Sequence, residues 1–250
     1  MLNIGPADRL TVLNDAPVRG GGDYVLYWMV AQRRSRHNWA LELALAEARR
    51  LDRPLVVLEA LRVDYPWASD RIHSFVIEGM AETSRAFEAA GIRHLAYLEP
   101  EPGAGKGLLA ALAARASLVV TDDFPVFFLP RMLAAAARDL DLRLIAVDGN
   151  GLLPIHEPRQ PFATAHAFRR YYQKNLRGHL ALAPLAEPLE HRAGPREQPD
   201  LDRLIAPWPL RSATDLDDPA AIVARLPIDH SVPAVAARGG MRAAAAKLDR

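Results

Sequence analysis

The hydrophobic positions of the first 150 residues form short apolar runs that alternate with longer amphipathic segments. Five of these runs are predicted strands, at residues 24–29, 55–61, 93–98, 118–122 and 143–148. The first run is apolar at every position, which is typical of a parallel strand buried on both faces. The intervening segments are predicted helices, near residues 39–51, 69–90, 108–116 and 129–140.

The helical pattern is clearest in residues 69–90, where Ile72, Val76, Met80 and Phe87 fall on one stripe. Asn38 stands directly before the first helix, where its side-chain oxygen can accept a hydrogen bond from the first turn. Strands that alternate with helices predict an α/β fold, with a five-stranded, mainly parallel, Rossmann-like sheet and helices on both faces. Such sheets bind ligands beyond the carboxyl ends of their strands.

The alternation stops near residue 150, and a helical and irregular connecting segment follows. We expect an α/β domain over residues 23–155, a helical extension packing on it over residues 156–185, and a linker segment over residues 186–250. Residues 184–200 hold four prolines among charged residues, which favours an extended conformation. Short helices are predicted near residues 219–226 and 242–248.

The composition excludes several kinds of site. The chain has no cysteine, which rules out disulfides, thiolate nucleophiles and cysteine-ligated zinc. The 31 basic side chains nearly balance the 30 acidic ones, so any electrostatic partner must be recognised by a local patch. The sequence shows no signal peptide, no apolar run of about 18 residues and no histidine pair at metal-ligand spacing. We therefore expect a cytoplasmic protein without a metal or a membrane partner.

Two stretches resemble functional motifs and have simpler explanations. The stretch "EPGAGKGLLAAL" has Pro100 where a phosphate-binding loop needs glycine, and Gly107 where it needs serine or threonine, which indicates a flexible helix entry instead. A predicted helix near residues 163–182 interleaves basic and aromatic side chains. Such a helix can bind nucleic acid or pack its aromatics on the sheet domain, and we favour packing. Its basic residues are Arg169, Arg170, Lys174 and Arg177, and its aromatic residues are Phe168, Tyr171 and Tyr172.

Polar residues follow the first, fourth and fifth predicted strands. They are Gln32, Arg33, Asp122, Asp148 and Asn150. If these strands are neighbours, the loops converge on one crevice, where the side chains can contact a ligand. Alternatively, they only end strands and cap helices. In the ligand-binding interpretation, truncating Asp122 or Asn150 weakens binding by about 1 to 3 kcal/mol and leaves the fold intact.

Several motifs resemble class II cyclobutane pyrimidine dimer photolyases of the photolyase/cryptochrome family. "YWMVAQRRSRHNWALELA" resembles the N-terminal signature of that family, and "RIHSFVIEGM" resembles one of its helices, with Met80 where leucine is common. "VVTDDFP" and "VDGNGLLP" resemble the turns after two of its strands. "LPIDHSVPAV", followed by "RGG", resembles the segment that joins its two domains.

The resemblance implies an α/β antenna domain, which in many family members holds a deazaflavin or folate chromophore. We expect such a chromophore in the crevice at Gln32, Arg33, Asp122, Asp148 and Asn150. The family's FAD and its repair of pyrimidine dimers in DNA belong to a larger helical domain. Because the sequence ends at Arg250, we expect this chain alone to bind no FAD, to have no catalytic residue, and to repair DNA only when completed by a FAD domain in trans or in a longer chain.

Two functions remain open from the sequence. The first is the N-terminal portion of a deoxyribodipyrimidine photolyase, a carbon-carbon lyase involved in light-driven DNA repair. The second is a stand-alone regulatory module that binds a nucleotide or chromophore with a photolyase-like fold.

Overall fold

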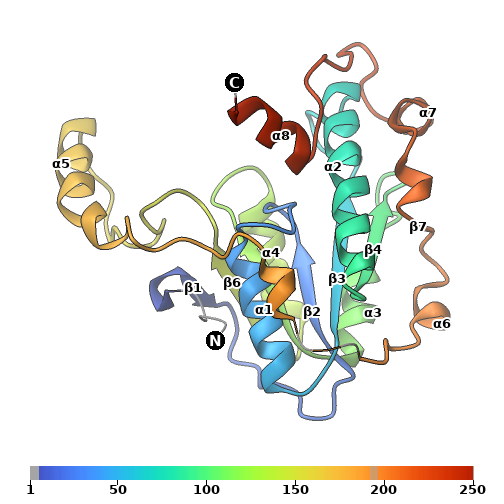
Figure 1. Ribbon diagram of the computed structural model, residues 1–250, viewed down its shortest axis with the longest axis horizontal. Coiled ribbons are helices and arrows are strands. Elements are labelled where there is room, and N and C mark those ends of the chain that lie inside the picture. Colours follow the sequence, from blue (N-terminus) through green and yellow to red (C-terminus); the bar gives the residue numbers. More distant parts are fainter. Residues whose placement is uncertain (1–5, 193, 195, 250) are drawn as a thin grey trace.

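A parallel sheet forms the centre of the computed structural model, which describes residues 6–192, 194 and 196–249 (Figure 1). Within these residues the sheet has seven strands in the order β1-β6-β5-β2-β3-β4-β7. The five inner strands are parallel, which confirms the predicted core: β2 (Tyr24–Met29), β3 (Leu55–Leu61), β4 (Arg93–Leu98), β5 (Ala116–Asp123) and β6 (Leu144–Asp148).

Two short antiparallel strands extend the sheet beyond the prediction. β1 (Leu10–Val12) pairs with β6, and β7 (Leu210–Arg211) pairs with β4. Segments of three and two residues are too short to show an alternating pattern, so only their partner strands define them.

Four helices cover the two faces of the sheet. α1 (Trp39–Arg50) and α2 (Asp70–Ala89) lie on one face, and α3 (Leu108–Arg115) and α4 (Leu129–Asp139) lie on the other. Successive side chains of β2 alternate between these layers: Tyr27 packs in the α1 core, and Trp28 in the α3 and α4 core. The predicted cap is confirmed, because Asn38 Oδ1 accepts a hydrogen bond from the Leu41 N–H at 3.0 Å.

The strand order places a topological switch point between β2 and β5. The chain moves from β2 through β3 to β4 in one direction across the sheet, and β5 and β6 lie on the other side of β2. The loops after β2 and β5 therefore leave neighbouring strand ends in opposite directions, which is where open α/β sheets form a crevice.

The chain after residue 185 contributes apolar side chains to the hydrophobic cores of the sheet domain. It contains α6 (Asp202–Ile205), α7 (Pro219–Val223) and α8 (Met241–Leu248), with 3-10 turns at Pro188–His191 and Thr214–Leu216. Ile205 joins the α3 and α4 core, while Leu216 and Val223 join α2. Among the described residues, this part of the chain therefore has no hydrophobic cluster of its own.

A close backbone contact holds the start of α8 on α2. A Cβ atom on Gly239 would lie 1.8 Å from the carbonyl oxygen of Phe75, so only glycine fits this position. The Gly239 N–H donates to Glu78 Oε2 at 2.6 Å, and Arg238 pairs with the same carboxylate. Gly240, the next residue, has a positive φ of 98°, which also favours glycine.

The structure differs from the expectation for the basic and aromatic helix. α5 (Ala165–Asn175), with a 3-10 turn at Leu176–Gly178, buries none of its side chains and stands apart from the sheet and its covering helices (Figure 1). Pro158 and Pro161 precede it in an irregular stretch that leads the chain away from the sheet.

A buried carboxyl group connects α1 with the segment that follows α5 and its 3-10 turn. Glu42 is fully buried, and its Oε1 accepts a hydrogen bond from the Leu185 N–H at 2.6 Å. Its Oε2 has no partner among the described residues. Burial raises the pKa of Glu42 to about 7, although the Leu185 N–H opposes the rise.

We predict that Glu42 makes the fold less stable as the pH rises. Its folded-state pKa of about 7 exceeds its ordinary 4.5, so the folded state binds the proton more tightly. The free energy of unfolding should therefore fall between about pH 4.5 and pH 7, by up to about 3 kcal/mol. Urea unfolding from pH 5 to pH 8 should show this slope in the native protein and a flatter one in Glu42→Gln. Glu47→Gln, on the same helix, should keep the native slope, and equal slopes in all three proteins would contradict the assignment.

Candidate functional site

The carboxylate of Asp122 lies at the switch point and holds the loop after β2. Its Oδ2 accepts hydrogen bonds from three successive N–H groups, those of Val30, Ala31 and Gln32, at 2.7 to 2.9 Å. Its Oδ1 accepts one from the Tyr27 hydroxyl at 2.7 Å. Burial raises the pKa of Asp122 above its ordinary value, against the lowering effect of these donors. The protein itself uses both oxygens of this carboxylate.

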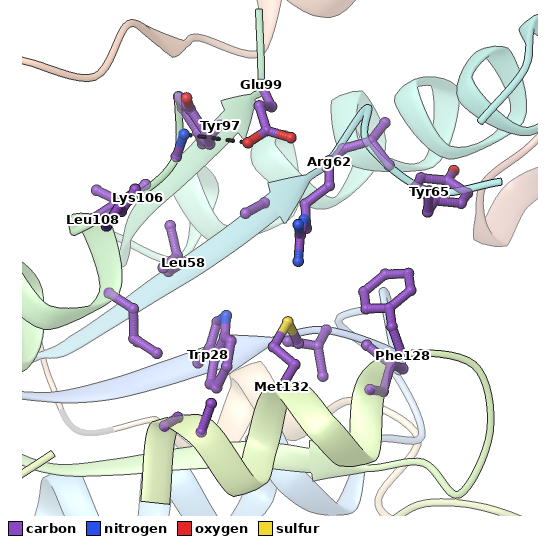
Figure 2. A pocket seen from close by; sticks show the side chains of 18 of the residues that line it. Trp28, Leu58, Arg62, Tyr65, Tyr97, Glu99, Lys106, Leu108, Phe128 and Met132 are labelled. Carbon is purple, nitrogen blue, oxygen red and sulfur yellow. Dashed lines mark hydrogen bonds between the residues drawn. The ribbon is translucent and has the colours of Figure 1, made fainter. Parts of the chain in front are cut away.

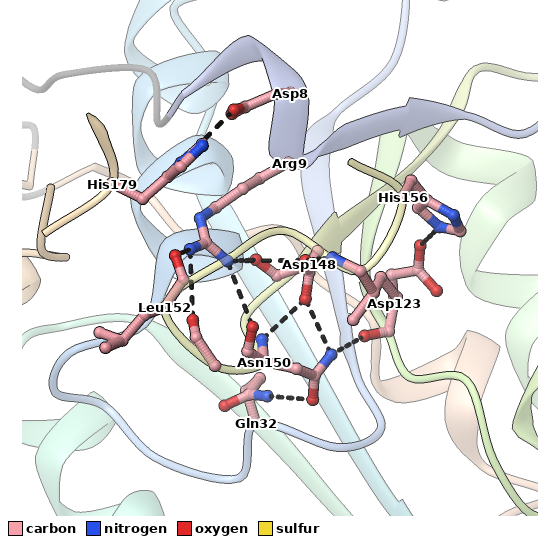
Figure 3. Close-up of polar contacts among 11 residues, drawn as sticks. Asp8, Arg9, Gln32, Asp123, Asp148, Asn150, Leu152, His156 and His179 are labelled. Atoms are coloured by element: carbon pink, nitrogen blue, oxygen red, sulfur yellow. Dashed lines mark hydrogen bonds and ion pairs between the residues drawn. The ribbon is translucent and has the colours of Figure 1, made fainter. Parts of the chain in front are cut away.

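A second network fixes the loop after β6 (Figure 3). Asp148 Oδ1 accepts from the backbone and side-chain amides of Asn150, and its Oδ2 accepts from the Ile155 N–H. Asn150 also donates to the Asp123 carbonyl at 2.7 Å, and its Oδ1 lies 3.5 Å from Gln32 Nε2. The loops after β2, β5 and β6 therefore do converge, as the sequence predicted for neighbouring strands.

Arg9 completes this second network, and the sequence analysis missed it. The side chain is buried, 3.5 Å from Asp148 Oδ2, and its guanidinium donates to four backbone carbonyls between residues 148 and 152 (Figure 3). Arg9 is more than 130 residues away in sequence, and no local pattern distinguishes it from a surface arginine.

Arg33 takes part in a third polar cluster, near the carboxyl end of β3. Its guanidinium donates to Glu59 Oε1 at 3.1 Å and to the Ala60 carbonyl at 2.7 Å. His94 Nε2 lies 3.2 Å from the other oxygen of Glu59, and Ser84 Oγ lies 2.8 Å from His94 Nδ1. Burial acts against ionisation of Glu59, but His94 and Arg33 outweigh it and lower its pKa. Ser84 is buried, so this serine, histidine and glutamate form an internal network that a substrate cannot reach.

A large open cavity lies beside the crevice, between the sheet and the α3 and α4 layer (Figure 2). Its volume is about 910 Å³. Trp28 and Leu58 line it from the sheet, Leu108 from α3, and Met132 from α4. A cavity of this size and mainly apolar lining is at the upper end of the roughly 300 to 1,000 Å³ typical of small-molecule sites.

The glycine-rich loop before α3 forms one side of this space. Gly103 and Gly107 have positive φ angles of 84° and 88°, and they delay the start of α3 until Leu108. Glu99 Oε1 accepts from the N–H groups of Gly103 and Gly105, while its Oε2 accepts from the Val63 N–H. The loop held by Glu99 therefore forms part of the cavity wall, with Gly103, Gly105, Lys106 and Gly107 among the lining residues.

Few polar groups line the cavity. The charged side chains among them are the cations Arg33, Arg62 and Lys106 and the carboxylates Glu99 and Asp139. The Arg62 guanidinium also lies 5.5 Å from the centre of the Phe128 ring. The Trp28 indole nitrogen points toward the open space (Figure 2) and donates to no acceptor among the described residues. A ligand carbonyl can therefore accept a hydrogen bond from Trp28 while its rings contact the apolar walls.

Of the five predicted site residues, Arg33 lines the cavity. Gln32, Asp122, Asp148 and Asn150 lie in the neighbouring loop networks and are not among its lining residues. Val30, in the same loop as Gln32 and Arg33, also lines the cavity, whereas Met29 is buried in the α1 core. The sequence analysis missed the other lining residues, such as Trp28 and Met132, because they come from strands and helices that are distant in the chain and meet only in the fold.

Neither a metal cluster nor a membrane helix is found in the described parts of the chain. No three histidine, cysteine or acidic side chains gather there, and no helix there is long and apolar enough to cross a bilayer.

An open, mainly parallel sheet with a large apolar cavity beside its switch point defines an α/β domain with a candidate ligand site. Residues 25–190 match the DNA photolyase family, and the chain belongs to that family. The chain is 32% identical over 149 residues to the deoxyribodipyrimidine photo-lyase of Methanothermobacter thermautotrophicus, a match that covers 60% of this chain and 33% of that protein. The chain therefore spans about one third of the length of this curated relative.

Among solved structures, a bacterial class III photolyase from Agrobacterium tumefaciens aligns with a TM-score of 0.48 and 20% sequence identity. The alignment covers 71% of this chain and 36% of that one.

We predict that Asp122 stabilises the fold rather than binding a ligand, which revises the expectation that its truncation leaves the fold intact. Asp122→Ala removes the acceptor of three backbone N–H groups and of the Tyr27 hydroxyl. The free energy of unfolding should fall by at least about 3 kcal/mol, measured by urea denaturation.

Asp123→Ala is the matched control for this prediction. The Asp123 carboxylate contacts the exposed side chain of His156, so its loss should change stability by less than about 1 kcal/mol. A similar stability loss in both variants would contradict the role of Asp122.

Proposed function

We propose that this chain is the antenna portion of a class II cyclobutane pyrimidine dimer photolyase and that its cavity holds a planar aromatic chromophore, a deazaflavin or a folate. The bound chromophore would absorb light and pass the excitation energy to the FAD of the complete enzyme. Light-driven repair of pyrimidine dimers in DNA, and FAD itself, are part of the proposal for the whole protein.

The cavity is the observation that carries this proposal. A fused aromatic ring system needs a deep apolar slot with a few fixed polar groups, and the space next to Trp28 has that character. Trp28 and Leu58 would contact one face of the rings from the sheet, and Met132 would contact them from α4. Lys106, at the side, would attract an anionic part of the ligand, whereas Arg62 already pairs with Asp64.

The assignment to class II rests on the sequence motifs. The run that ends in Tyr27, Trp28 and Met29 and the helix start at Asn38 and Trp39 resemble the signature of that class. Trp28 of this signature lines the cavity. Asn38 lies on the opposite, α1 face of the sheet, where its Nδ2 donates to the Tyr27 hydroxyl that contacts Asp122.

The second candidate is a stand-alone regulatory module that uses the same cavity for a nucleotide. A nucleotide carries a phosphate group that needs several backbone N–H donors or cations. The glycine-rich loop next to the cavity already directs the Gly103 and Gly105 N–H groups to Glu99, which favours the chromophore.

We predict that filling the cavity prevents chromophore binding. Ala135 lies on α4 and lines the cavity, so Ala135→Trp should place an indole ring in the ligand space. Titration of the full chain with a deazaflavin and with a folate chromophore, followed by fluorescence, should give saturable binding of one of them. Ala135→Trp should weaken that binding at least tenfold, or about 1.4 kcal/mol.

Ala134→Trp is the matched control, because Ala134 is exposed on the same helix and does not line the cavity. It should bind the chromophore as the native chain does. Equal binding by both variants would place the chromophore elsewhere, and binding of a nucleotide but of neither chromophore would favour the regulatory module.

A further inference from the structure

The segment from residue 158 to residue 182, which we call the arm, forms a separate projection from the sheet domain. It contains α5 and the 3-10 turn that follows it, and Figure 1 shows both away from the sheet. The buried cores of the protein contain none of its residues. Near its end, His179 lies 3.7 Å from Asp8, which connects the arm with the start of the sheet domain.

The aromatic side chains of the arm pack on one another. Phe162 lies against Phe168 and Tyr171, with ring centres 5.5 Å and 5.0 Å apart, and Phe168 lies 5.9 Å from Tyr172. Tyr171 also donates to the carbonyl of Glu157 at the base of the arm. The aromatic side chains of this amphipathic helix therefore find their packing partners within the arm. They do not need the sheet domain to pack against.

The charges of the arm are all of one sign. Between Pro158 and Ala186 the sequence has no aspartate or glutamate and five cations: Arg159, Arg169, Arg170, Lys174 and Arg177. The whole chain has a net charge of only +1, so this segment carries +5 and the remainder carries −4. The five side chains are exposed, and none makes an ion pair with a described residue. Such a concentration of charge indicates a polyanionic partner.

Three of these cations are arranged in a row. Arg170, Lys174 and Arg177 are four and three residues apart, so they lie on one stripe of the helix and its continuing turn. At about 1.5 Å per residue they extend over roughly 10 Å. Phosphates of one DNA strand follow each other at about 3.4 Å along the duplex axis, so the row spans about three of them.

We propose that the arm binds the phosphate backbone of DNA without sequence preference, through Arg170, Lys174 and Arg177. A protein partner would need an apolar centre for its interface, and the aromatic rings of the arm already pack on one another. Phosphate binding needs only exposed cations at suitable spacing. The choice of DNA among polyanions rests on the proposed photolyase function, whereas the position of the site rests on the arm alone.

The test compares two triple variants of the full chain that remove equal charge. The first is Arg170→Gln, Lys174→Gln and Arg177→Gln. The control is Arg203→Gln, Arg225→Gln and Lys247→Gln, three exposed cations without an ion pair to a described residue. Binding to a labelled, undamaged 30-base-pair duplex is followed by fluorescence anisotropy between 50 and 200 mM salt.

Loss of three phosphate contacts should reduce the slope of log affinity against log salt by about 3 and weaken binding roughly 100-fold at 0.1 M salt. The control variant should stay within about threefold of the native chain and keep its slope. Both variants should unfold at the native temperature, because the substituted side chains are exposed.

Three outcomes would overturn the proposal. They are the absence of DNA binding by the native chain at 50 mM salt, an unchanged salt slope in the arm variant, and an equal loss of affinity in the control. A labelled polyglutamate peptide that binds the arm when DNA does not would assign the surface to an acidic protein partner. Chromophore binding is measured on the same proteins, so failure of the cavity proposal is distinguishable from failure of this one.

Discussion

The fold depends on one buried carboxylate at its switch point. Asp122 sits at the end of β5, and three N–H groups of the loop after β2 donate to a single one of its oxygens. Without Asp122, these N–H groups would lack a hydrogen-bond partner at the point where the loops after β2 and β5 separate. Tyr27 and Asn38 extend the network to the start of α1. Hydrogen bonds therefore connect β2, the loop after it and α1 to β5.

This constraint also decides where a ligand can bind. Open parallel sheets usually offer the strand ends at the switch point, but here Asp122, Asp148 and Arg9 fill them with internal hydrogen bonds. The open volume lies instead on the α3 and α4 face, where the glycine loop before α3 lines it. The rigid network next to it keeps β2 and β5 in place, so that Trp28 is held in the cavity wall. The chromophore site that we propose therefore lies beside the switch point, on the α3 and α4 face of the sheet, and not at the strand ends themselves.

The apolar cavity and the cationic arm lie in different parts of the molecule. The cavity is bounded by buried strands and two helices, whereas the cations of the arm are carried on a segment that buries no helical side chain. A site for a planar chromophore requires a fixed shape, which the sheet supplies. Attraction to a polyanion acts over about 10 Å at ordinary salt and does not require a fixed shape. The two proposed functions are thus supported by parts of the structure with different rigidity.

The sequence by itself determined the parallel core and its four covering helices, because buried strands and amphipathic helices are encoded in runs of neighbouring residues, such as 24–29 and 70–89. It also indicated that the loops after β2, β5 and β6 meet. Only the tertiary structure decided what those loops do, since the role of Asp122 depends on N–H groups about 90 residues away and that of Arg9 on carbonyls about 140 residues away. The same holds for the cavity and the arm: a volume left open between layers, and a helix that packs on nothing, are properties of how elements are placed in space and leave no periodic signal in the chain.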